Sequence, residues 1–302
     1  MNKYKHVHNA SIKEIACREY AYGEDLTTEI YLSKMETKWA IIAKSIIDDN
    51  DIDDNTDLTY NDLLLFISLS MTRTAKIADM YNEFMSYFEN EFNAIKQSGR
   101  ELAFDEEEFF KERQTPNKIP MEIATDSVDI LNDLIPLIIK NNTNRYFITT
   151  DNPVTLYNQL YVTRKYRVNY GTYAVGLQIF ITLSPHICLC LFDPLVYNVK
   201  LSTDFTVEIN SISQINEINK MIAMNSYKCL FYNNLMDRSY IQKLASYKKK
   251  PSSNIKVLDT NLGAKSLIKF GDDSIHANIQ LPIFTIKDLY ILHSRHHITR
   301  TC

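Results

Sequence analysis

The spacing of apolar positions in the first half of the chain predicts helices. Over residues 27–47 apolar side chains recur every three or four positions, at Leu32, Met35, Trp39, Ile42 and Ile46. This recurrence is typical of one buried helical face. A second helix is predicted from Thr59 to about residue 92, and a third over residues 121–140, where Pro136 would perturb it.

The second half changes to short runs rich in β-branched and aromatic residues, which predict strands. These runs are residues 145–150, residues 176–184 and 186–194 joined through Ser184 and Pro185, residues 228–232, and three tail segments at 254–259, 266–270 and 275–284. Helices are expected at residues 211–227 and 285–297. Because helices come first and strands follow without regular alternation, we expect an α+β fold.

The expected architecture is a single domain spanning residues 1–302. Residues 1–142 would form a mainly helical part, packed on a mixed, mainly antiparallel sheet within residues 143–302. A chain of 302 residues lies near the upper size of one hydrophobic core. The formal net charge is only −4, so no global field indicates nucleic acid as a partner.

Residue counts and the absence of targeting patterns also indicate the cellular compartment. Five cysteines without a CxxC pair argue against a disulfide framework and favour a reducing compartment. No apolar signal core or membrane-spanning run is visible, so we expect a cytoplasmic protein without a membrane partner. Only six glycines are present, which disfavours phosphate-cradling loops.

One cation lies on an otherwise apolar helical face. Arg73 follows Phe66 and Ser70, and precedes Ile77, at helical spacing. A buried guanidinium without a partner is very costly, so Arg73 should meet a carboxylate or an anionic ligand. The alternative is that the stem of Arg73 lies on the core while its head reaches water.

One carboxylate follows a buried strand. Asp151 comes directly after the run Tyr146–Thr150 and begins the sequence Asp151-Asn152-Pro153. Such a sequence is typical of a turn, because Asp and Asn bind nearby backbone N–H groups and proline fixes the next φ. A carboxylate at a strand end is also well placed for a ligand site. We predict that Asp151 and Arg73 are partners, in a structural pair or half of an active site.

Several segments together resemble the bacterial domain of unknown function 4238. In chain order they are "YLSKMETKW", "LTYNDLLLFISLSMTRT", "FITTDNPV", "LQIFITLSPHICLCLFDP" and "INKMIAMNSYKCLFY", and the resemblance spans roughly residues 10–235. The family pattern falls on Arg73-Thr74, Asp151-Asn152-Pro153, Leu183-Ser184-Pro185 and Asn219. The resemblance implies that these positions matter to the family, but it carries no reaction. The family's initial His-x-Val-Pro segment has no match here.

Other residues add candidate ligand contacts. Arg164, Lys165 and Arg167 alternate with tyrosines over residues 161–171, a pattern that suits single-stranded nucleic acid or a nucleotide. The same pattern fits a solvated loop. His186, Cys188 and Cys190 alternate on one predicted strand, and because three ligands on one strand surround a metal poorly, we interpret the cysteines as core residues.

Two functional hypotheses follow. In the first, the protein is a hydrolase-like or nuclease-like effector of defence or toxin type, with catalytic residues Asp151, Asn152 and Arg73. Arg164, Lys165, Arg167 and Asn219 would then bind substrate, and a divalent metal ion is compatible with this chemistry. In the second, the protein is a non-catalytic binding or interaction module in which Arg73 and Asp151 form a structural ion pair. No resident metal site is predicted, and a protein partner is not defined by the sequence.

Overall fold

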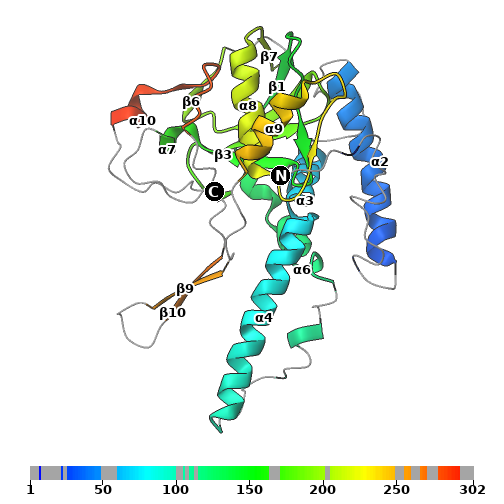
Figure 1. The fold of residues 1–302 in the computed structure, drawn as a ribbon, viewed down its shortest axis with the longest axis vertical. Coiled ribbons are helices and arrows are strands. Elements are labelled where there is room, and N and C mark those ends of the chain that lie inside the picture. The colour runs from blue at the N-terminus through cyan, green and yellow to red at the C-terminus, as the bar shows by residue number, and fades with distance from the viewer. Residues whose placement is uncertain are drawn as a thin grey trace.

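The computed structural model describes most of the chain. The described residues are 7, 22, 26–48, 60–99, 105, 109–111, 115–162, 171–200, 205–248, 255–259, 266–270 and 278–292. In this part of the chain, helices occupy the N-terminal half and a mixed sheet occupies the C-terminal half (Figure 1). This arrangement confirms the predicted α+β class.

A five-stranded sheet with the order β3-β4-β5-β1-β7 forms the centre. Its strands are β1 (Ile135–Asn141), β3 (Val154–Tyr157), β4 (Gln178–Thr182), β5 (Ile187–Phe192) and β7 (Thr206–Ile209). All neighbours are antiparallel except β1 and β7, which run parallel. The sheet is therefore mixed and mainly antiparallel, as predicted.

Both faces of the sheet are buried, because each packs against its own hydrophobic cluster. Successive side chains on a strand point to these two opposite faces. On β5, Cys188 and Cys190 belong to the hydrophobic cluster on one face, whereas Leu189 and Leu191 belong to the cluster on the other. Helices α8 (Ile212–Asn225) and α9 (Arg238–Ser246) contribute to the first cluster. The sheet thus forms the middle layer of three.

The N-terminal helices cover the second face. Helix α3 (Tyr60–Thr72) packs Leu64 and Ile67 against the sheet, and α2 (Thr27–Asp48) lies on α3. The rings of Trp39 and Phe66 join α2 to α3, with centroids 5.4 Å apart. Figure 1 shows α4 (Ala75–Gln97) extending away from this body as a long helix. No helix in the described parts of the chain is long and apolar enough to cross a membrane.

The prediction of one helix from Thr59 to residue 92 is wrong, because the chain breaks between α3 and α4 at Arg73 and Thr74. Thr74 is the N-cap of α4, and its Oγ1 accepts the N–H of Ile77 at 3.3 Å. The side chain of Asn117 donates to the carbonyls of Thr72 and Thr74 at 2.7 and 3.1 Å. These bonds stabilise two helix ends in place of a continuous helix.

The predicted helix over residues 121–140 is also wrong. The segment contains the end of α6 (Lys118–Asp126), the 3₁₀ helix η2 (Val128–Leu131) and then most of strand β1. Pro136 is tolerated in β1 because the pairing with β7 begins only at Ile138, so no ladder bond on that side needs its missing N–H. The sheet-containing part consequently begins before residue 143, the boundary predicted from the sequence.

Smaller strand pairs complete the fold. Only Thr149–Thr150 of the predicted strand 145–150 is a strand, β2, which pairs with β8 (Leu230–Phe231). Strands β9 (Ile255–Asp259) and β10 (Ser266–Phe270) form a hairpin. The predicted strand 275–284 begins outside the described residues, and its described part, 278–284, contains no strand. The strand nearby is β11 (Thr285–Ile286), which pairs with β6 (Tyr197–Asn198) and leads into α10 (Asp288–Leu292).

Candidate functional site

The carboxylate of Asp151 joins two turns. Asp151 lies in the turn between β2 and β3, and its two oxygens accept the backbone N–H groups of Tyr227 at 2.9 Å and Lys228 at 2.6 Å. Its own N–H donates to the carbonyl of Cys229 at 3.4 Å. Because Tyr227 and Lys228 lie in the turn between α8 and β8, one side chain fixes that turn against the start of β3.

Asn152 forms a reciprocal pair with Asn225 at the end of α8. The amide of Asn152 donates to the carbonyl of Asn225 at 3.0 Å, and the amide of Asn225 donates back to the carbonyl of Asn152 at 3.0 Å. Asn225 also donates to the carbonyl of Val154 and to the hydroxyl of Thr155. These bonds hold the Asp-Asn-Pro turn against α8, so Asn152 has a demonstrated structural partner.

Asn219 is buried in the middle of α8, with no exposed surface. Its Oδ1 accepts the N–H of Ile148 at 3.1 Å, and its Nδ2 donates to the carbonyl of Tyr146 at 2.8 Å and to the hydroxyl of Tyr240 at 3.2 Å. Residues 146–148 are not in a strand, so a side chain replaces the missing ladder partner. Asn219 therefore anchors the segment that leads to Asp151.

Arg73 has a carboxylate partner, but the partner is not Asp151. The guanidinium donates to Glu36 of α2 at 2.5 Å and to the hydroxyl of Tyr22 at 3.1 Å. Burial alone would lower the pKa of Arg73, but Tyr22 and Glu36 outweigh it and raise the pKa. The predicted Arg73–Asp151 pair is wrong, because α2 supplies the acid for Arg73 and backbone N–H groups satisfy Asp151.

The charged residues associated with Asp151 come from the turn after α8, from the segment after α9 and, through Lys228, from α4. The Lys228 ammonium binds Asp79 of α4 at 3.1 Å, and the Tyr227 hydroxyl also donates to Asp79. Burial lowers the pKa of Lys248, while the nearby negative charge of Asp151 acts in the opposite direction. We name Asp79, Asp151, Tyr227, Lys228, Cys229 and Lys248 the Asp151 cluster.

The sequence pattern gave no signal for the members of this cluster other than Asp151. Lys248 belongs to a run of three lysines that is typical of a linker, and Lys228 and Cys229 lie in a predicted strand. Among the predicted site residues, the structure brings Asp151 and Asn152 together, and it places Asn219 two turns before the end of α8. Arg164, Lys165 and Arg167 lie outside the described residues.

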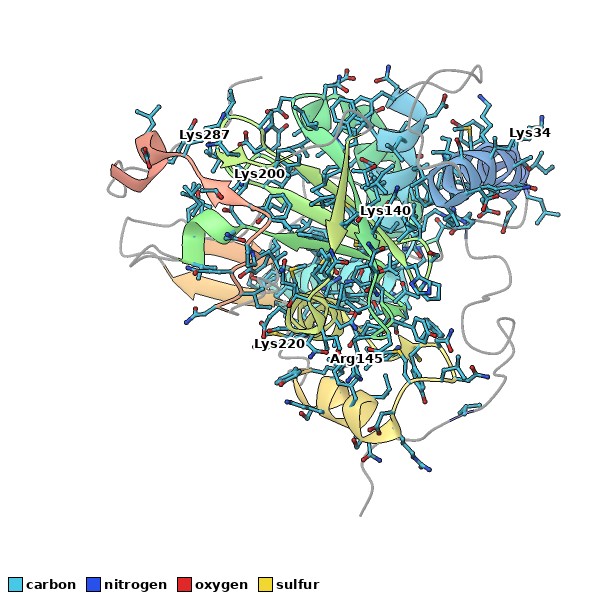
Figure 2. The ribbon with its side chains drawn as sticks, turned by 90° about the horizontal axis from the view of Figure 1, so that it is seen from above. Lys34, Lys140, Arg145, Lys200, Lys220 and Lys287 are labelled. Atoms are coloured by element: carbon cyan, nitrogen blue, oxygen red, sulfur yellow. The ribbon has the colours of Figure 1, made fainter. Side chains whose placement is uncertain are left out.

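Basic side chains are distributed over several elements. Figure 2 shows Arg145 and Lys220 near α8 and α9, whereas Lys34 lies on α2 and Lys287 lies near α10. The Arg145 guanidinium stacks 4.0 Å above the ring of Tyr240, and the Lys220 ammonium lies 5.4 Å from the ring of Tyr247. These contacts fasten α9 to its neighbours by cation–π interactions.

The described residues contain no group of three or more His, Cys, Asp or Glu side chains that could hold a metal ion. His186 is exposed, and its Nδ1 lies 3.1 Å from the carbonyl of Asn141. Cys188 and Cys190 have no exposed surface, which confirms their interpretation as core residues. No resident cofactor can be assigned from these side chains.

Burial sets the reactivity of the sheet cysteines. It raises the pKa of Cys188 to about 12 and the pKa of Cys190 well above its usual value. For a pKa near 12, only about 1 in 10⁴ thiols is ionised at pH 8, and the thiolate is the nucleophile. We expect iodoacetamide at pH 8 to leave both cysteines unmodified in the native protein, as measured by peptide mass spectrometry.

The half-buried Cys229 serves as the internal comparison for this prediction. Burial and then the charge of Asp151 raise its pKa, but its side chain is partly accessible, so slow modification is expected. In denaturant Cys188, Cys190 and Cys229 should react at similar rates. Native-state labelling of Cys188 or Cys190 as fast as Cys229 would contradict the buried environment of β5.

The model of the family described as "Protein of unknown function (DUF4238)" matches residues 1–235. The chain belongs to this family. The match extends beyond the range 10–235 expected from the motifs, to residue 1. No curated protein and no solved structure gives a significant match.

The extent of the family match divides the structural features of the molecule into two groups. Asp151, Asn152, Asn219 and the turn at Tyr227 lie within the DUF4238 region. Helix α9, with Tyr240, and the nearby Lys248 follow it, as does everything C-terminal to them. The family region therefore contains the sheet and the Asp-Asn-Pro turn, whereas part of the Asp151 cluster comes from beyond it.

Proposed function

We propose that this chain is a non-catalytic interaction module that acts in the cytoplasm. The observation that supports this role is the use of the Asp151 carboxylate: each oxygen accepts a backbone N–H from the turn after α8. A carboxylate used in this way stabilises a turn, and both of its oxygens are already bound by the main chain. The buried amides of Asn152 and Asn219 likewise bind backbone groups.

The interaction-module hypothesis assumed a single ion pair between Arg73 and Asp151. In the structure two separate contacts, called anchors below, take its place. Arg73 fastens the break between α3 and α4 to α2 through Glu36, and Asp151 fastens the β2–β3 turn to the α8–β8 turn. Both anchors join segments that are distant in sequence. They hold in place the helices that cover the two opposite faces of the sheet.

Substituting Asp151 with Asn tests this proposal. The asparagine retains one acceptor oxygen and introduces an NH₂ group facing a backbone N–H donor. We expect a loss of about 1–3 kcal/mol in the free energy of unfolding, since one charge-assisted bond is lost and a donor is left unsatisfied. Urea unfolding measures the loss. The control is Asp126→Asn, at an exposed position at the end of α6 without a described side-chain bond, where no comparable loss is expected.

The electrostatic influence of Asp151 on Lys248 favours a second candidate, a hydrolase-like or nuclease-like activity of defence or toxin type. The charges of Asp151 and Lys228 both act on Lys248, and a half-buried amine in the field of a carboxylate suits proton transfer or phosphate binding. In that case Asp151→Asn would abolish cleavage of RNA, DNA or nucleotides, or toxicity on expression, without changing the unfolding midpoint. A stable, inactive variant of an active protein would overturn the interaction-module proposal.

A further inference from the structure

The segment that follows the β9–β10 hairpin lies across the edge of the core. We name residues 278–287 the strap. Figure 1 shows its C-terminal end and α10 beside β6 and α7 (Gln159–Val162). Ile279 and Leu281 have no exposed surface, and Phe284 is 3% exposed. These three side chains are thus buried as deeply as those of the sheet, although the strap lies beyond the DUF4238 match.

Two side chains bind the main chain of the strap. The Tyr157 hydroxyl donates to the carbonyl of Ile279 at 2.7 Å and accepts the N–H of the same residue at 2.9 Å. Gln159 accepts the N–H of Leu281 at 2.8 Å and donates to the carbonyl of Phe284 at 3.0 Å. Because all four bonds go to backbone atoms, they fix the main chain of the strap, including its turn at residues 281–284, without selecting its side chains.

Contacts among aromatic rings hold the side chain of Phe284. The ring of Phe284 lies among the rings of Phe180, Phe192 and Tyr197, with centroid distances of 6.2, 5.7 and 5.6 Å. Buried aromatic anchors of this kind dominate the affinity of peptide interfaces. At the far end of the strap, the Lys287 N–H donates to the carbonyl of Val196 at 2.9 Å.

The partners of the strap are held in place by bonds that do not involve the strap. The Gln159 N–H donates to the side chain of Gln178 at 2.9 Å. The Tyr197 hydroxyl accepts the N–H of Leu160 at 3.0 Å and donates to the carbonyl of Gly176 at 2.8 Å. A surface organised independently of its occupant is the usual condition for peptide docking, because little ordering remains to be done on binding.

We propose that Tyr157, Gln159, Phe180, Phe192 and Tyr197 form a docking groove for an apolar peptide with a turn before its aromatic anchor, which the strap occupies in this chain. The partner class is a segment with the strap's pattern, Ile-x-Leu-x-x-Phe. The resident strap supports this choice, since it shows which chemistry the groove accepts. This inference deepens the proposed interaction role, because it names the surface and the partner class.

The test uses the full-length chain with a specific protease site placed within residues 271–277. After folding and cleavage, a fluorescent peptide with the sequence of residues 278–292, NIQLPIFTIKDLYIL, is added and its anisotropy is measured. We expect saturable binding that the unlabelled peptide competes and that releases the resident fragment. Absence of binding, or unfolding of the cleaved protein as its fragment leaves, would show that the strap is an inseparable part of the fold.

Peptide variants test the mode of recognition without changing the protein. Phe284→Ala in the peptide should weaken binding about 100-fold or more, because it removes the buried aromatic ring. N-methylation of the Leu281 amide removes the donor to Gln159 and should weaken binding about 10-fold. The matched controls are Gln280→Ala and N-methylation of Gln280, an exposed residue without a described bond, and they should change binding by less than about 3-fold. Equal affinities for all these peptides would contradict the proposed docking groove.

Protein variants provide the reciprocal measurement. Gln159→Leu in the cleaved chain should weaken the parent peptide about 10-fold and should abolish the effect of N-methylation at Leu281. Gln242→Leu on α9 is the control. If the cleaved protein does not bind the peptide, the stability effect of Asp151→Asn is still expected. If Asp151 is instead catalytic, peptide binding is unaffected. The two proposals can therefore fail separately.

Discussion

Asn219→Leu is expected to destabilise the protein by about 3 kcal/mol or more. The leucine would leave the N–H of Ile148 and the carbonyl of Tyr146 without their partner, and it would remove a bond to the Tyr240 hydroxyl. Each unsatisfied buried group costs roughly 1–3 kcal/mol. No water can replace the amide easily, because Asn219 has no exposed surface.

The matched control is Asn216→Leu on the same helix. The Oδ1 atom of Asn216 is buried without a hydrogen-bond partner among the described residues, so its removal takes away a desolvated acceptor. We expect no loss of stability, or a small gain, in the same urea titration. Equal losses for the two variants would mean that α8 merely tolerates leucine poorly and that Asn219 has no special role.

Gly176→Ala is expected to cost about 3 kcal/mol, from two physical causes. The backbone of Gly176 has φ +79°, a conformation that alanine rarely adopts. A Cβ atom would also lie 3.0 Å from Oδ1 of Asn158 and 3.2 Å from Cβ of Leu160. Those neighbours are constrained, because Asn158 is fully buried and binds the carbonyl of Val175 at 2.8 Å.

Gly99→Ala separates the two causes. Gly99 has nearly the same backbone conformation, φ +77°, but nothing lies within 4 Å of the position of its Cβ. We expect a loss of about 1 kcal/mol from backbone strain alone. The difference between the two alanine variants, measured by thermal or urea unfolding, then gives the cost of the close packing at Gly176. Equal losses would remove close packing as a cause.

The apolar pattern was sufficient for the α+β class and for most individual elements. Helices α2 and α8 lie where residue spacing predicted them, since local periodicity reports which face of a helix is buried. Strands β4 and β5 lie where runs of β-branched and aromatic residues predicted them. The prediction failed at Pro136 and at Arg73-Thr74. Pro136 is tolerated in a strand because the neighbouring strand β7 does not extend that far. The helix breaks at Arg73-Thr74 because the side chain of Asn117 stabilises the two helix ends.

The candidate site was only partly predictable. Asp151 and Asn152 were correctly recognised as a turn after a strand, and Arg73 was correctly expected to need a carboxylate. The identity of each partner was not accessible, because Glu36, Tyr227 and Lys228 are remote from the residues that they bind and carry no distinctive spacing. Charge and composition define that a partner is required, but they do not define which segment provides it.

By itself, the sequence determined the class of fold, the family and the residues that demand polar partners. Each of these depends on local spacing or on a short motif. Only the tertiary structure decided that Arg73 and Asp151 anchor different parts of the molecule, and that the main chain of residues 278–287 is bound by Tyr157 and Gln159. Hydrogen bonds act over about 3 Å, so their partners are fixed by how distant segments pack, which periodicity along the chain does not encode.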